Sequence, residues 1–146
     1  MRTSLASYVI VPCFLVSGAL AAEPADPPDI EIRPNVPYRD GNPAWRLDLA
    51  MKKERGEKPC PGIVIIHGGG WIEGDKSSFA SKKHGVPGNI VEFAEFGFVA
   101  ATINYRMSKE APFPAALDDC REAVRWLRGP LRSGRRVEQP AGDRLG

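Results

Sequence analysis

The residues with the clearest chemical character form a glycine-rich loop, HGGGW at residues 67–71, which follows the apolar run IVII at residues 63–66. Loops of this kind have two common uses. Consecutive backbone N–H groups can wrap a phosphate group, or they can stabilise a substrate oxygen that becomes negatively charged during acyl transfer. Glycine suits both uses, because it lacks a Cβ and lets the backbone approach a ligand closely.

The residues that follow the loop disfavour phosphate binding. A phosphate-binding P-loop has Gly, four residues, Gly, and then Lys and Ser or Thr in direct succession, because the lysine must reach the phosphates. Residues 69–74 (GGWIEG) meet the first part of this pattern, but Asp75 intervenes before Lys76. Asp75 and Glu73 also bring negative charge to the place of an anionic ligand. We therefore interpret the loop as an oxyanion-binding loop.

An α/β sheet is predicted to hold this loop. Residues 29–36 and 44–50 alternate apolar and polar side chains, and turn residues fill 38–43, a pattern that predicts a β-hairpin. Residues 62–67 form a continuous β-branched run, which is typical of a strand covered on both faces. The loop thus leaves the carboxyl end of a buried strand, where open α/β sheets bind their ligands.

Two helices and a further strand are predicted after the loop. Residues 88–96 predict a short helix that ends at Gly97, and residues 98–103 predict a second buried strand, so the two strands form a right-handed parallel crossover. Residues 112–114 open a helix that Gly129 and Pro130 end. Its apolar face comprises Leu117, Cys120, Val124 and Leu127. This order of elements predicts the first part of a mostly parallel sheet with helices on both faces.

Several sequence blocks, in order, resemble the HGGG-type esterases and lipases of the α/β-hydrolase fold. HGGGW is similar to the oxyanion motif that follows the third strand of that fold. The flanking blocks are LDL (47–49), GDK (74–76), NYR (104–106), FPAA (113–116) and Asp119 with AVRWLR (123–128). Together they resemble secreted acetyl-esterase and xylan-esterase-like members over residues 29–128. The resemblance implies a partial α/β-hydrolase sheet that stops before the nucleophile elbow, with oxyanion amides at Gly68, Gly69 and Gly70.

Four residues are predicted to shape the oxyanion loop. His67 is expected to hydrogen-bond within the loop, because the catalytic histidine of the family comes near the end of the chain. Trp71 is expected to pack over the loop. Arg106 and Asp119 either pair to brace the loop against the following helix or form a solvated pair with no measurable effect.

The resemblance does not extend to the catalytic triad. The nucleophile of the fold lies in Gly-x-Ser-x-Gly, and no such pentapeptide occurs among the 146 residues. No acid and histidine follow in the family's order either. We expect the N-terminal fragment of a secreted carboxylesterase that acts on small acyl esters, acetylated polysaccharide among them, and is inactive alone. A non-catalytic fragment or gene remnant is the alternative, and a peptidase or amidase of the same fold would share the loop.

The two ends of the chain differ from the middle. Arg2, the apolar run at residues 8–20 and the small residues at 19–21 predict a signal peptide at 1–21, because the run is shorter than the roughly 20 residues that span a membrane. A polar, proline-rich leader follows at 22–28. The tail at 129–146 lacks an apolar run long enough for the next strand, and a reading-frame shift near Arg128 is one hypothesis for it. The predicted product is secreted or periplasmic, without a stable membrane anchor after cleavage.

Composition narrows the set of partners. The formal net charge is +2, and no basic run precedes the tail, so nucleic-acid binding is not expected. A small-molecule or carbohydrate ester is the expected substrate, with no cofactor and no metal. Cleavage would remove Cys13 and leave Cys60 and Cys120, for which a disulfide and two partly buried thiols are both open.

Overall fold

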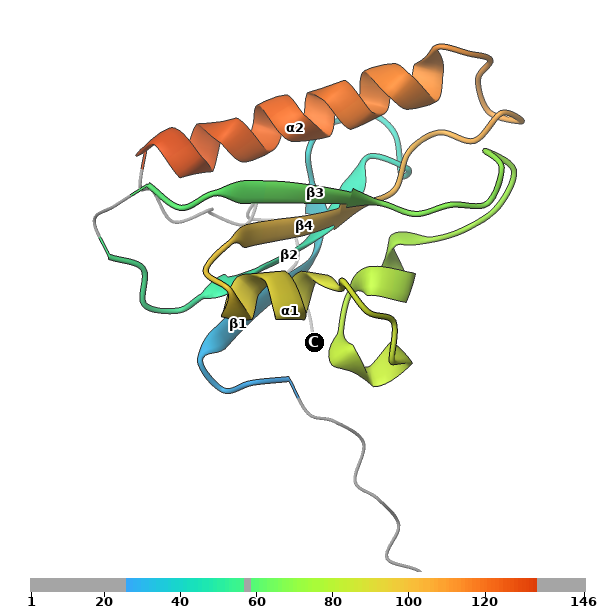
Figure 1. Cartoon of the computed structure of the whole chain (residues 1–146). Helices are drawn as coiled ribbons and strands as arrows, with labels where there is room; N and C mark the ends of the chain where they lie inside the picture. The colour runs from blue at the N-terminus through green and yellow to red at the C-terminus, as the bar shows by residue number, and fades with distance from the viewer. Residues whose placement is uncertain (1–25, 57–58, 134–146) are drawn as a thin grey trace, which may run out of the picture.

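The computed structural model describes residues 26–56 and 59–133. In this part of the chain, four strands form one mixed sheet in the order β1-β2-β4-β3, with α2 on one face and α1 on the other (Figure 1). This architecture confirms the predicted partial α/β-hydrolase sheet. The predicted signal peptide, the leader up to residue 25 and the tail from residue 134 lie outside the described residues.

The predicted hairpin is present as β1 (Ile30–Pro37) and β2 (Arg46–Lys52), which pair antiparallel. Their register shifts between Arg33 and Val36, where Asn35 has a positive φ of 57°. Such a bulge re-aims backbone groups. Here the backbone N–H of Asn35 donates a hydrogen bond to Oδ1 of Asp48 on β2, with an N···O distance of 2.7 Å.

The predicted strand, helix and strand are also present, as β3 (Gly62–Ile66), α1 (Ile90–Glu95) and β4 (Val99–Ile103). The prediction that the first of these strands is covered on both faces is wrong for the described residues, because β3 has no buried residue, whereas all of β4 is buried. β3 and β4 are parallel, and β4 pairs antiparallel with β2. The Asn89 side chain caps α1 by accepting hydrogen bonds from two amides of its first turn. Two short 3-10 helices, η1 (Lys76–Phe79) and η2 (Lys82–His84), lie between β3 and α1 and were not predicted.

Alternation along the strands divides the core into two layers, because successive side chains point to opposite faces of a sheet. The layer under α2 includes Leu47, Leu49, Val99, Ala101, Ile103, Ala123 and Leu127. The layer under α1 includes Ile30, Ala50, Ile90, Val91, Ala94 and Ala100. None of the helices within residues 26–56 and 59–133 is both long and apolar enough to cross a membrane.

The last helix, α2 (Ala115–Ser133), differs from its prediction in two ways. Gly129 and Pro130 do not end it, since the helix continues to Ser133, although an interior proline removes one backbone hydrogen bond and crowds the preceding turn. The buried face is also rotated from the predicted one. It follows Asp119, Ala123 and Leu127, which are at most 3% exposed. The buried carboxylate of Asp119 sets this face, which an apolar pattern alone does not reveal.

β3 forms one edge of the sheet that the described residues build. Ile66 at its end is 50% exposed. An open strand edge with apolar side chains is a template for pairing with another chain. We therefore expect the chain to self-associate at micromolar concentrations.

Replacing Ile66 with Lys should reduce this self-association, because a lysine on an edge strand opposes edge-to-edge pairing. Size-exclusion chromatography with light scattering gives the oligomer distribution. Phe96→Lys is the matched control, since Phe96 is 81% exposed at the end of α1, on the sheet face opposite α2. An equal shift toward monomer in both variants would argue against pairing through β3.

Candidate oxyanion loop

The HGGGW loop follows the carboxyl end of β3, at the same end of the sheet where β4 leads into residues 104–112 (Figure 1). The Gly69 carbonyl accepts hydrogen bonds from the amides of Ile72 at 3.0 Å and Glu73 at 3.2 Å. Gly69, Gly70 and Trp71 have φ values of 120°, 61° and 61°. Successive left-handed residues therefore bend the chain sharply just after the strand.

The three glycines whose amides are predicted to bind the oxyanion lie at the surface. Gly68, Gly69 and Gly70 are all exposed. Within the described part of the chain, their backbone N–H groups donate no hydrogen bond to a protein acceptor. Such N–H groups can be satisfied by water or by a ligand oxygen.

His67 is fixed at the start of the loop by three contacts. Its side chain is buried, and its Nδ1 lies 2.8 Å from the Gly68 carbonyl oxygen. Its ring stacks on Tyr105 at a centroid distance of 4.7 Å, and the Tyr105 hydroxyl donates to the His67 carbonyl at 2.9 Å. Burial raises the pKa of Tyr105, so the hydroxyl remains a donor at neutral pH. His67 therefore contacts the loop and Tyr105 through both its ring and its backbone.

The far end of the loop closes onto this start. Gly74 has a φ of 114°, and a Cβ added there would lie 2.4 Å from His67 Nδ1 and 2.5 Å from the Gly68 carbonyl oxygen. Real side chains do not tolerate such distances. Only glycine therefore allows residue 74 to pack against His67.

A buried ion pair ties the end of the loop to the sheet, and sequence reasoning missed it. Lys76 Nζ lies 2.7 Å from Asp48 Oδ1, and the two side chains are 8% and 5% exposed. Both residues belong to blocks quoted for the family resemblance, but the pairing across 28 positions has no local signal. Because its ammonium is buried in this pair, Lys76 is not presented to a phosphate, in agreement with the rejection of a P-loop.

The structure brings Arg106 and Asp119 together. Arg106 Nε and Nη2 donate to the two carboxylate oxygens of Asp119 at 2.8 and 2.7 Å, and the Arg106 backbone amide adds a third bond at 3.0 Å. Burial would raise the pKa of Asp119, but the hydrogen bonds from Arg106 outweigh it and hold the pKa below its usual value. The hydrogen bond to Asp119 raises the pKa of Arg106. Asp119 is fully buried, so the pair is not the solvated one considered as the alternative.

Trp71 is 64% exposed, so most of its side chain is open to solvent, and it lines the hollow beside the loop. Its backbone carbonyl accepts a hydrogen bond from the Ser108 amide at 2.8 Å. This bond joins the glycine loop to the segment that follows β4.

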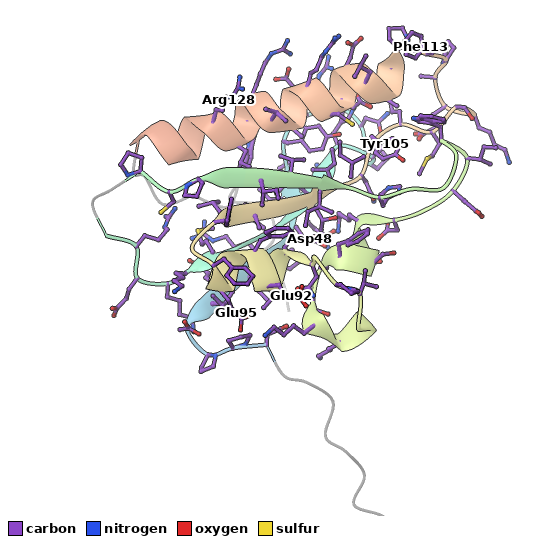
Figure 2. The ribbon with its side chains drawn as sticks, viewed as in Figure 1. Asp48, Glu92, Glu95, Tyr105, Phe113 and Arg128 are labelled. Carbon is purple, nitrogen blue, oxygen red and sulfur yellow. The ribbon has the colours of Figure 1, made fainter. Side chains whose placement is uncertain are left out.

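A largely apolar hollow of about 640 Å³ adjoins the loop. Figure 2 shows two of its lining residues, with Phe113 at the start of α2 and Tyr105 near the end of β4. Its other lining residues include Ile66, Gly70, Trp71, Ala116, Leu117 and Cys120. Burial raises the pKa of the Cys120 thiol, which keeps it protonated and a poor nucleophile. The arrangement can hold an apolar group beside the glycine loop, and Ser108 and Arg106 add polar groups to its lining.

Among residues 26–56 and 59–133, no group of three or more His, Cys, Asp or Glu side chains could hold a metal ion.

Several known proteins with similar sequence or structure carry the name esterase. Esterase LipC of Mycobacterium tuberculosis is 30% identical over 112 residues, which are 77% of this chain and 25% of LipC. The crystal structure of esterase B from Lactobacillus rhamnosis superposes with a TM-score of 0.59 at 24% identity, over 76% of this chain and 35% of that one. A truncated carbohydrate esterase from gut microbiota gives a TM-score of 0.54 at 26% identity, over 70% of this chain and 34% of that one.

The chain thus spans about a quarter to a third of the length of these proteins. The family model BD-FAE matches residues 47–131, which include the glycine loop, both members of the buried ion pair and most of α2. The match, the α/β-hydrolase sheet and the position of the loop agree with one another. The chain therefore belongs to the BD-FAE family and corresponds to an N-terminal portion of the α/β-hydrolase esterases.

Proposed function

We propose that this chain is the N-terminal part of a secreted carboxylesterase that hydrolyses small acyl esters. The amides of Gly68, Gly69 and Gly70 stabilise the oxyanion of the tetrahedral intermediate, and one such donor contributes about 3–4 kcal/mol to the transition state. The observation that carries the proposal is the set of three exposed glycines at the carboxyl end of β3, beside an apolar hollow, whose amides find no acceptor among the described residues.

Acetylated polysaccharide is the substrate class that we propose within this activity. The similarity to a carbohydrate esterase supports it. An acetyl group is small and apolar, so the hollow beside Gly70 has room for it with the carbonyl oxygen directed to the loop. Export through the predicted signal peptide at residues 1–21 would bring the protein to such a polymer.

We further propose that the chain is inactive alone. Acyl transfer by this fold needs a serine activated by a neighbouring base. No Gly-x-Ser-x-Gly occurs in the sequence, and the His67 Nδ1 is engaged with the Gly68 carbonyl. The nucleophile, acid and histidine would have to come from another polypeptide segment.

A turnover assay with p-nitrophenyl acetate and acetylated xylan tests the proposal. The purified chain should give no hydrolysis above buffer, and a mixture with the polypeptide encoded in the downstream reading frames should hydrolyse both esters. If the mixture also fails to hydrolyse the esters, the result would favour a non-catalytic fragment or a gene remnant. Hydrolysis by the chain alone would contradict the proposed dependence on a separate nucleophile.

A further inference from the structure

We propose that Lys76 is the positioning residue of the oxyanion loop, and that the buried Asp48–Lys76 pair holds the glycine amides in their orientation. The use of those amides rests on the proposed function, but the positioning does not. Lys76 is fixed at three atoms. Its Nζ donates to Asp48 at 2.7 Å, its amide donates to Asn104 Oδ1 at 2.7 Å, and its carbonyl accepts from Thr102 Oγ1 at 3.1 Å.

The receiving site is part of the rigid sheet. Asp48 on β2 and Thr102 on β4 are direct cross-strand partners, and they are 3% and 0% exposed. They alternate with Leu47 and Ile103 of the α2 layer, so both side chains face the α1 side, where Figure 2 shows Asp48. The Asn35 amide at the bulge of β1 also donates to Asp48 at 2.7 Å. Two strands and a bulge therefore fix the carboxylate that receives the lysine.

Two residues connect this anchor to the glycine amides. Asp75 is held on one oxygen by Asn104 Nδ2 at 2.7 Å and on the other by the Ser77 amide at 2.8 Å. Gly74 is packed so closely on His67 and the Gly68 carbonyl that it has no room for a Cβ. A shift of Lys76 must therefore move Gly74, and a shift of Gly74 changes the path of the bend that begins at Gly68.

Single and double replacements in a buried ion pair can distinguish a positioning role from a contribution to the stability of the core. Removing one partner leaves an uncompensated buried charge, whereas replacing both by neutral groups of similar size is often neutral for stability. A neutral pair would keep the core filled but would remove the charge-assisted bond that fixes Lys76 on the sheet. A double variant can therefore retain the fold and lose the anchor.

The test compares Lys76→Met, Asp48→Asn and the double variant in the full chain, at a dilution where light scattering finds monomer. Hydrogen exchange at the amides of Ile72 and Glu73 reports on the closed loop, because both donate to the Gly69 carbonyl. In the double variant we expect this exchange to be at least roughly tenfold faster, while amides of β4 exchange as in the unaltered chain. The matched control is Lys82→Met with Glu95→Gln, which removes an equally short but more exposed ion pair of 2.7 Å.

Three outcomes would overturn the proposal: unchanged exchange at Ile72 and Glu73 in the double variant, an equal effect in the control, or no protection of these amides in the unaltered chain. Exchange is measured without substrate, so its result does not depend on esterase activity. If the mixture with the downstream polypeptide hydrolyses esters, the double variant should lower kcat more than it changes KM, because only the transition state uses the oriented amides. If the mixture hydrolyses no ester but hydrogen exchange changes as expected, the proposed function is rejected and the positioning role of Lys76 is retained.

Discussion

Replacing Asp119 with Asn should lower the free energy of unfolding by about 3 kcal/mol, because it removes the charge from one partner of a buried ion pair. Asp119 is fully buried and accepts three hydrogen bonds from Arg106. The Arg106 side chain is 23% exposed, so water can solvate part of the guanidinium and keep the loss near the lower end for such pairs. Denaturant unfolding at neutral pH measures the difference.

Asp118→Asn is the matched control for this prediction. Asp118 is adjacent in sequence and pairs with Arg121 at 3.3 Å, but these side chains are 55% and 58% exposed. Exposed pairs contribute little to stability. The control should therefore unfold within about 0.5 kcal/mol of the unaltered chain. Equal losses in the two variants would show that the buried Arg106–Asp119 bonds do not stabilise the fold.

The effect of Asp119→Asn should also depend on pH. The folded-state pKa of Asp119 lies below the unfolded value of about 3.9. A carboxylate with a lowered pKa contributes stability that is fully present above the unfolded pKa and is lost as the pH falls through the folded pKa. The difference between the two proteins should be constant near neutrality and shrink below about pH 4. A constant difference at all pH values would contradict this assignment.

The fold could be predicted from the sequence where the signal is local. The β-branched run at residues 62–67 and the alternation at residues 29–36 and 44–50 predicted the strands, because these patterns are local in the sequence. The burial did not follow from the patterns, since five consecutive residues of β2 are buried and no residue of β3 is. The helix at residues 88–96 was predicted in the same way, and the structure places its start and end two residues and one residue inside that range. The loop was found because three consecutive glycines after a strand have a specific chemical use.

The features that the sequence did not predict depend on contacts between residues far apart in the chain. The burial of Lys76 depends on Asp48, 28 positions earlier, and neither residue lies in an apolar pattern that would predict it. The buried face of α2 depends on Asp119, which is buried because Arg106 neutralises it across 13 positions. A hydrophobic pattern places such residues on the surface, so the sequence predicted the glycine loop but not its anchor.

Replacing Gly69 with Ala should open the oxyanion loop. A Cβ at this position would lie 1.8 Å from the Glu73 carbonyl oxygen, and the φ of 120° is one that side chains rarely adopt. The backbone strain costs about 1–3 kcal/mol, and the loop can relieve it only by losing the bonds from Ile72 and Glu73 to the Gly69 carbonyl. We expect the exchange protection of both amides to be lost. In a mixture with esterase activity, we expect kcat to fall by a factor of about 100 or more.

Alanine variants of the neighbouring glycines distinguish the effect of a steric clash from the effect of an unfavourable backbone torsion. Gly70 has a φ of 61° with open space around a Cβ, so Gly70→Ala should cost only the left-handed strain of about 1 kcal/mol. A Cβ on Gly68 meets no atom within 4 Å, and Gly68 does not have a positive φ, so Gly68→Ala should change stability by less than about 0.5 kcal/mol. Exchange and unfolding measurements on the three variants should rank them in the order Gly68, Gly70, Gly69, from the mildest effect to the most severe. Equal effects at all three positions would mean that the loop is not closed by the bonds to the Gly69 carbonyl, and the amides would then lack the fixed geometry that oxyanion binding requires.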